Sequence, residues 1–232
     1  MGCMRTLTAV GHRGDPYRFR ENTLASIRSA FDRGADAVEI DVRMTRDGVP
    51  VLLHDEDLQR LWGHDVRLDA VTAPQLRELA GGAIPTLREA LMAAGAGRVM
   101  LDLPGATAET VRTVVGQVRE CGARDRTYYC AGPNTMLAVR AADPGAEIAL
   151  TWTTLAPPRR VLIDAVAPSF LNYRFGLVGR ELVDALHRDG LRVSAWTPDT
   201  KRSMRAMVTA GVDSITTNRV DVLTAVRAGL GR

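Results

Sequence analysis

Short apolar segments alternate with longer amphipathic segments along almost the whole chain. In the longer segments, apolar residues recur every three or four positions and a glycine usually follows, which is typical of helices. The expected strands are Leu7–His12, Ala37–Val42, Val49–His54, Arg98–Leu103, Thr127–Cys130, Glu147–Trp152, Ala165–Pro168, Arg192–Trp196 and Ser214–Thr217. The expected helices are Asn22–Arg33, capped by Asn22, then Thr86–Ala94, Ala108–Cys121, Asn134–Ala142, Arg180–Asp189, Thr200–Ala210 and Asp221–Ala228. This repeated strand–helix order predicts a mostly parallel sheet.

Nine strands are expected, one more than the eight of a (β/α)8 barrel, and the dipeptide Asp47-Gly48 accounts for the extra strand. Asp-Gly between two strands favours a tight antiparallel hairpin. Val49–His54 should therefore fold back from the second strand and carry His54 over the top of the barrel. A doubly wound sheet would not need eight regular units, and no Gly-x-Gly-x-x-Gly follows the first strand. We predict an α/β protein that forms one domain over residues 1–232, a (β/α)8 TIM barrel with a short insertion after the second strand.

Acidic side chains lie near the ends of two expected strands. Glu39 and Asp41 stand two apart in the segment AVEIDV, so they point to the same face of their strand. Two acids on one face of an apolar strand repel each other unless a positive charge lies between them. Asp102, in the segment VMLDLP, offers a third carboxylate from the next barrel strand. Oxygen ligands of this kind predict a divalent metal site for Ca²⁺ or Mg²⁺.

Two histidines and an arginine belong to the same predicted mouth, because the active sites of such barrels lie where the strands end. His12 ends the first strand and His54 ends the hairpin, and this pair can act as general acid and general base. Arg13 can hold a phosphate oxygen in a forked arrangement. Together with the metal, these residues predict phosphodiester cleavage that needs no other cofactor.

Charge and composition narrow the partners. The chain has 232 residues, a net charge of +3 and one lysine, Lys201, and its arginines are scattered. We expect no nucleic-acid partner, and no apolar run is long enough to span a membrane. The start of the chain lacks a signal-peptide hydrophobic region, and Cys3, Cys121 and Cys130 show no metal-binding spacing. Free thiols and a cytoplasmic location are therefore expected, and the oligomeric state is left open.

A series of short motifs resembles the glycerophosphodiester phosphodiesterases in both order and spacing. The first group is His12-Arg13-Gly14, Glu21-Asn22-Thr23, Gly34-Ala35-Asp36, Glu39 with Asp41, Asp47-Gly48 and His54-Asp55. The second group is Ile84-Pro85-Thr86-Leu87, Trp196-Thr197 and Gly211-Val212-Asp213. Each motif alone is weakly specific, but the ordered set covers nearly the whole chain.

The resemblance implies a metal-dependent hydrolase of lipid metabolism that releases an alcohol and glycerol 3-phosphate. It implies that His12 and His54 are the catalytic acid and base, and that Glu39 and Asp41 bind Ca²⁺ or Mg²⁺. It also implies that Arg13 contacts the phosphate and that Trp196 lines the substrate pocket. A cyclic-phosphate route, in which a substrate hydroxyl attacks phosphorus, is compatible with the same residues.

The chain departs from the family pattern at a few positions. Asp102-Leu103-Pro104 stands where the family has Glu-x-Lys, so Lys201 or Arg43 would have to replace the missing positive charge. Asn218 stands where the family has Asp, and the insertion is short, which predicts a more open pocket. Two alternatives therefore remain. One is a phospholipase D-like enzyme that acts on lysophospholipids, as in the sphingomyelinase D branch. The other is a degenerate barrel that binds phosphorylated ligands without turnover.

Overall fold

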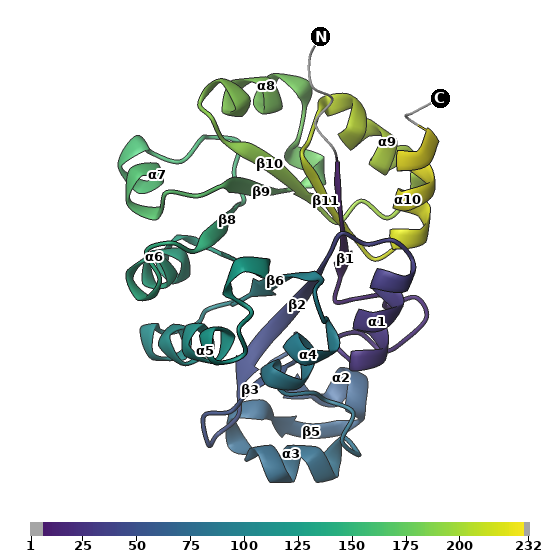
Figure 1. Cartoon of the computed structure of the whole chain (residues 1–232), viewed down its shortest axis with the longest axis vertical. Helices are drawn as coiled ribbons and strands as arrows, with labels where there is room; N and C mark the ends of the chain where they lie inside the picture. Colours follow the sequence, from purple (N-terminus) through teal and green to yellow (C-terminus); the bar gives the residue numbers. More distant parts are fainter. Residues whose placement is uncertain (1–6, 230–232) are drawn as a thin grey trace.

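Eight parallel strands close into a barrel in the computed structural model, which describes residues 7–229. Strand β1 pairs with both β2 and β11, and this double pairing closes the cylinder. Figure 1 shows the strands in the middle of the molecule and the helices around them. The barrel strands are β1 (Thr8–His12), β2 (Ala37–Met44), β6 (Arg98–Asp102), β7 (Thr127–Ala131), β8 (Glu147–Trp152), β9 (Phe170–Arg174), β10 (Arg192–Trp196) and β11 (Ser214–Thr217). The predicted (β/α)8 barrel is confirmed.

The outer helices pack against the outward-facing side chains of the strands. These side chains, such as Val38, Ile40 and Leu101, are fully buried in the larger apolar cluster. Inward-facing positions of the strands form a second cluster, which includes Val10, Met100 and Phe170 and fills the barrel interior. The outer helices are α1 (Leu24–Asp32), α4 (Leu87–Ala93), α5 (Ala108–Glu120), α6 (Pro133–Ala142), α7 (Arg160–Val166), α8 (Arg180–Arg188), α9 (Lys201–Ala210) and α10 (Val220–Ala228).

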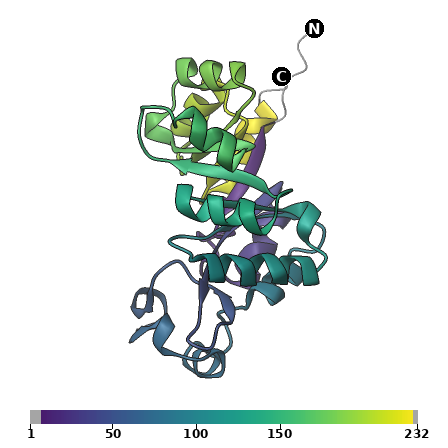
Figure 2. The same ribbon diagram turned by 90° about the vertical axis from the view of Figure 1, so that its left-hand side faces the viewer.

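The predicted hairpin after the second strand is confirmed. Strand β3 (Pro50–Leu52) runs antiparallel to β2, with Val42 opposite Leu52, and Gly48 takes the left-handed conformation in the turn with φ 77°. The chain then forms β4 (Asp57–Leu58), α2 (Gln59–Trp62), β5 (His64–Arg67) and α3 (Ala73–Leu79). These elements enclose a small apolar core of their own, and Figures 1 and 2 show them at the lower end of the molecule.

Two local expectations are wrong. The segment expected as the strand Ala165–Pro168 is the end of α7 and the turn after it, and β9 begins only at Phe170. Ala167 takes the left-handed conformation that ends the helix, at φ 46°. Asn22 does not cap α1; Thr23 does, by accepting a hydrogen bond from the Ser26 amide.

The structure also bears on the cysteines and on the length of the helices. Cys121 and Cys130 are free thiols, and Cys3 lies outside the described residues. Within residues 7–229, every helix falls short of the length and apolar character that crossing a bilayer requires.

Gly14 provides a test of the loop that follows β1. Its φ is 86°, and a Cβ there would lie 2.4 Å from Oγ of Ser26, whose hydroxyl bonds the backbone of Arg13 and Asp15. We expect Gly14→Ala to cost about 2–5 kcal/mol, from left-handed strain plus overpacking. Gly48→Ala is the matched control, since its φ is 77° but nothing lies within 4 Å, and it should cost only about 1–2 kcal/mol. Urea unfolding measures both free energies, and equal losses would contradict the steric argument.

Candidate active site

A cavity of about 280 Å³ opens where the barrel strands end. All seven residues singled out in the sequence line it, although they come from five different segments of the chain. They are His12, Arg13, Glu39, Asp41, His54, Asp102 and Trp196. On the barrel strands the lining side chains occupy alternate, inward-facing positions, so the two-residue period of a strand brings them to one place. The structure therefore assembles the whole predicted set in one cavity.

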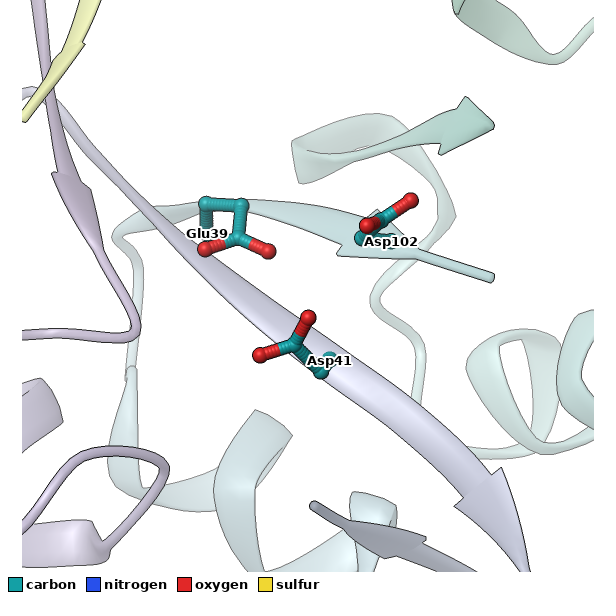
Figure 3. A group of neighbouring side chains, drawn as sticks. All are labelled: Glu39, Asp41 and Asp102. Atoms are coloured by element: carbon teal, nitrogen blue, oxygen red, sulfur yellow. The ribbon is translucent and has the colours of Figure 1, made fainter. Parts of the chain in front are cut away.

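Three carboxylates form the floor of this cavity. Glu39 and Asp41 leave the same face of β2, and Asp102 lies directly opposite Asp41 on the neighbouring strand β6 (Figure 3). Oxygen atoms from all three lie within 4.8 Å of one another, and Glu39 and Asp41 are only 4% and 1% exposed. Two oxygens that bind the same Ca²⁺ at about 2.4 Å lie at most about 4.8 Å apart. The spacing and the donor type both fit a hard divalent cation.

Burial and mutual repulsion change the acidity of this cluster. Burial, together with the charges of Asp41 and Asp102, raises the pKa of Glu39 well above its ordinary value. Burial and the charge of Asp41 raise the pKa of Asp102 to about 7. Carboxylates placed this closely with little water resist ionisation unless a cation neutralises them. The acidity of the cluster thus agrees with the metal site that its geometry fits.

Arg13 supplies part of the opposing charge. Its backbone amide donates to Oε2 of Glu39 at 2.9 Å, and its Nε lies 3.2 Å from Oδ2 of Asp41. Asn22 donates from Nδ2 to the same Asp41 oxygen at 2.7 Å. Both Arg13 and Asn22 take the left-handed conformation, with φ 57° and 56°, which only a few per cent of non-glycine residues adopt. The loop is therefore held in a strained shape that brings donors to the acids.

Asn218 fixes the orientation of His12. The Nδ2 group of Asn218 donates to Oδ2 of Asp199 at 2.7 Å, so its Oδ1 is turned toward Nδ1 of His12, 2.8 Å away. An amide oxygen only accepts, so His12 carries its proton on Nδ1 and keeps a lone pair on Nε2. Burial and the charge of Arg13 lower the pKa of His12, which favours this neutral form. This arrangement leaves Nε2 of His12 able to accept a proton.

His54 is oriented by a carboxylate instead. Its Nδ1 lies 2.7 Å from Oδ1 of Asp55, and a hydrogen bond from Arg60 is the main reason that the pKa of Asp55 falls to about 2. An ionised carboxylate only accepts hydrogen bonds, so Nδ1 donates and Nε2 is left for the cavity. The side chain of His54 is 43% exposed, in contrast to 19% for His12.

A neutral residue, Pro104, stands where the resemblance leads us to expect a lysine. Pro104 lines the cavity, and Lys201 is an exposed residue at the start of α9 that does not line it. Arg43 lies nearer: it donates to the carbonyl oxygen of His54 at 2.7 Å, and its charge partly offsets the rise in the pKa of Asp102 that burial and Asp41 cause. Of the two cations considered from the sequence, Arg43 is the one beside the site.

Three residues around the cavity escaped the sequence analysis. Asp199 bonds Asn218, 19 residues away, and Arg60 bonds Glu21, 39 residues away, so no local pattern reveals either residue. Cys130 lines the cavity and lies 3.1 Å from both Oγ1 of Thr151 and Nδ2 of Asn172. Its inward position on β7 is the one signal in the sequence that would have found it.

The chain is similar to glycerophosphodiester phosphodiesterases over nearly its whole length. The pattern of the glycerophosphoryl diester phosphodiesterase family matches residues 12–222. A glycerophosphodiester phosphodiesterase from Caldanaerobacter subterraneus is 28% identical over 95% of this chain and 97% of the relative.

Two solved structures share the fold. A glycerophosphodiester phosphodiesterase from Thermotoga maritima superposes on this chain with a TM-score of 0.82 at 23% identity, over 95% of this chain and 98% of that one. A phosphodiesterase from Oleispira antarctica, in complex with the product sn-glycerol-3-phosphate, superposes with a TM-score of 0.88 at 21% identity, over 94% of this chain and 96% of that one.

Replacing Asp102 with asparagine tests the repulsion within the cluster. The folded pKa of about 7 lies above the ordinary value of about 3.9, so ionised Asp102 costs stability as pH rises through this interval. Without metal at pH 8, Asp102→Asn should unfold at a higher temperature, by roughly 2–4 °C for each kcal/mol of repulsion removed. The gain should vanish below about pH 4, where the carboxyl is protonated in both states.

The same variant should lose most of the thermal stabilisation that Ca²⁺ or Mg²⁺ gives the parent protein. Asp65→Asn, which changes an exposed carboxylate of the insertion, is the matched control and should respond to metal like the parent. Melting curves with added metal and with EDTA measure both effects. An unchanged metal response in Asp102→Asn would remove this residue from the site.

The pair Asp199 and Asn218 allows a swap experiment. Asn218→Asp alone places two carboxylates against each other, so His12 loses a well-held acceptor and activity should fall about 10–100-fold. Adding Asp199→Asn restores one amide and one carboxylate, and most of the activity should return. Initial rates with a glycerophosphodiester compare the parent, the single variant and the double variant. A double variant as impaired as the single one would argue against the hydrogen-bond chain.

Proposed function

This chain belongs to the glycerophosphoryl diester phosphodiesterase family, and we propose that it hydrolyses glycerophosphodiesters to an alcohol and glycerol 3-phosphate in a metal-dependent reaction with two-histidine catalysis. The observation that carries the proposal is one cavity in which His12 and His54 stand beside three clustered carboxylates. The product complex of the Oleispira antarctica relative, which contains sn-glycerol-3-phosphate, supports the same substrate class.

Glu39, Asp41 and Asp102 would hold the divalent cation, Ca²⁺ or Mg²⁺. When bound, the cation neutralises the carboxylates and polarises the phosphate. Arg13 would bind a phosphate oxygen in addition, since it lines the same cavity and its guanidinium lies beside Asp41. Trp196 would form the wall against which the glycerol part of the substrate lies.

The two histidines would divide the proton transfers. His12, neutral and with the Nε2 lone pair free, would take the proton from the attacking oxygen, which belongs to water or to a substrate hydroxyl. The new oxygen–phosphorus bond forms as the bond from phosphorus to the alcohol oxygen breaks. His54, protonated on both ring nitrogens before the reaction, would donate its Nε2 proton to that leaving oxygen and become neutral with its remaining proton on Nδ1, so the charges balance. If a substrate hydroxyl attacks, the product is a cyclic phosphate that water opens in a second step.

A lysophospholipid substrate is the second candidate, and one feature favours it. Beside the cavity lies a groove to which Phe175, Leu177 and Trp196 contribute apolar surface, next to the charged Arg174, and Trp196 belongs to both the groove and the cavity. An acyl chain attached to the glycerol would have room there. A panel of lysophospholipids separates the two substrates, because only the second candidate predicts headgroup release from them.

The main test is release of glycerol 3-phosphate from glycerophosphocholine with Ca²⁺ or Mg²⁺, and its loss with EDTA. We expect His12→Ala and His54→Ala each to lower kcat about 10²–10⁴-fold, the range of general acid–base catalysis. His64→Gln is the control, because His64 bonds the Leu79 carbonyl in the insertion and should be silent. Full activity in either alanine variant would overturn the mechanism. Absence of any metal-dependent turnover in the parent would favour a barrel that only binds phosphorylated ligands.

A further inference from the structure

A single arginine of the insertion lies between two carboxylates from separate parts of the chain. Arg60, in α2, donates from Nη2 to Oε1 of Glu21 at 2.6 Å and from Nη1 to Oε2 of the same carboxylate at 3.2 Å. Its Nε donates to Oδ2 of Asp55 at 2.6 Å. Glu21 belongs to the loop after β1, and Asp55 follows the hairpin that carries His54.

Each of these carboxylates also contacts a residue that lines the cavity. The second contact of Glu21 is with Nη1 of Arg13, 2.8 Å from its Oε1. The second contact of Asp55 is with Nδ1 of His54, 2.7 Å from its Oδ1. A continuous chain of hydrogen bonds therefore runs from Arg13 through Glu21, Arg60 and Asp55 to His54. Its two ends are in the cavity, and its middle is not among the residues that line it.

The charges favour this arrangement over a chance surface contact. The side chain of Arg60 is 47% exposed, but those of Glu21 and Asp55 are only 12% and 22% exposed. Burial alone would raise the pKa of Glu21, yet the hydrogen bonds and charges of Arg60 and Arg13 outweigh it, and the pKa lies below its ordinary value. The planar guanidinium can donate to both carboxylates at once, which a lysine ammonium cannot do in the same fixed geometry.

We propose that Arg60 is a positioning residue for the reaction: from the insertion it holds Asp55 against His54 and Glu21 against Arg13. The roles of His54 and Arg13 in this statement rest on the proposed function. The insertion then contributes to the site, because one of its side chains orients both His54, the proposed proton donor, and the guanidinium of Arg13. A change at Arg60 should disturb both ends of the chain of contacts.

Kinetics give the first test. Arg60→Gln should lower kcat/KM for glycerophosphocholine about 10–100-fold, the usual effect of removing a residue that orients a catalytic group. Arg60→Lys should recover only part of this loss. The matched control is Arg67→Gln. Arg67 also lies in the insertion and also pairs with two carboxylates, Glu56 and Asp69, but it contacts none of the residues between Arg13 and His54 in the series of hydrogen bonds. Equal losses in the glutamine variants at 60 and 67 would overturn the proposal.

A second measurement does not depend on activity. The protein has four histidines, so the ¹⁵N imidazole signals of His54 can be assigned by comparison with His54→Gln. With Asp55 held as the acceptor, neutral His54 should carry its proton on Nδ1 in the parent and in Arg67→Gln. In Arg60→Gln, the signals should shift toward a mixture of both tautomers. An unchanged tautomer in Arg60→Gln would overturn the proposal.

The two measurements separate this proposal from the proposed function. If the parent has no phosphodiesterase activity but the tautomer of His54 changes in Arg60→Gln, the orienting contact stands and the reaction assigned to the site is wrong. If the parent is active and neither kcat/KM nor the tautomer responds to Arg60→Gln, the reaction stands and the role of Arg60 is wrong. The free energy of unfolding, measured in urea for both glutamine variants, shows that each still folds.

Discussion

The repulsion among three crowded carboxylates is the constraint around which the mouth of this barrel is organised. Oxygen atoms of Glu39, Asp41 and Asp102 lie within 4.8 Å of one another, and Glu39 and Asp41 are buried. Such a cluster is unfavourable without protons or a cation, and the raised pKa values of Glu39 and Asp102 express that cost. The left-handed backbone of Arg13 and Asn22 is a second local cost, and it places hydrogen-bond donors against the same acids. A functional site departs here from the stability optimum of the fold.

The two histidines have the same side chain but different hydrogen-bond acceptors, and this difference supports the separate roles that we propose for them. An amide oxygen faces Nδ1 of His12, and a carboxylate faces Nδ1 of His54. Both acceptors hold the proton on Nδ1, but only the acceptor of His54 is itself charged. His12 is also the more buried ring and lies beside the Arg13 charge, which favours its neutral form. The surroundings of each ring are therefore the basis on which we propose a base at His12 and an acid at His54.

The features that the sequence predicted depend on short-range patterns, and the features that it missed depend on contacts between distant residues. Strand periodicity placed Glu39 and Asp41 on one face, and Asp47-Gly48 indicated the hairpin that carries His54. The strand β9 was misplaced because the preceding helix has only seven residues, too few for a clear helical period. Asn22 was expected to cap the first helix because asparagine is common at that position. Its actual partner, Asp41, is 19 residues away, and no local pattern indicates that contact. The link from Arg60 to Glu21 spans 39 residues and is equally invisible in the sequence.

The neutral residue Pro104, where the resemblance predicts a lysine, changes how this cavity can receive an anion. Among the described residues that line the cavity, Arg13 is the one arginine or lysine, against three carboxylates, and Arg43 nearby is already engaged with the carbonyl oxygen of His54. A negatively charged phosphodiester would therefore meet a net negative surface while the acids are ionised. Only protons or a divalent cation can reverse that sign, and Asp102, with a pKa of about 7, exchanges its proton near neutral pH. Under the proposed function, recognition of phosphate then rests less on fixed charge in the protein and more on cation occupancy and pH.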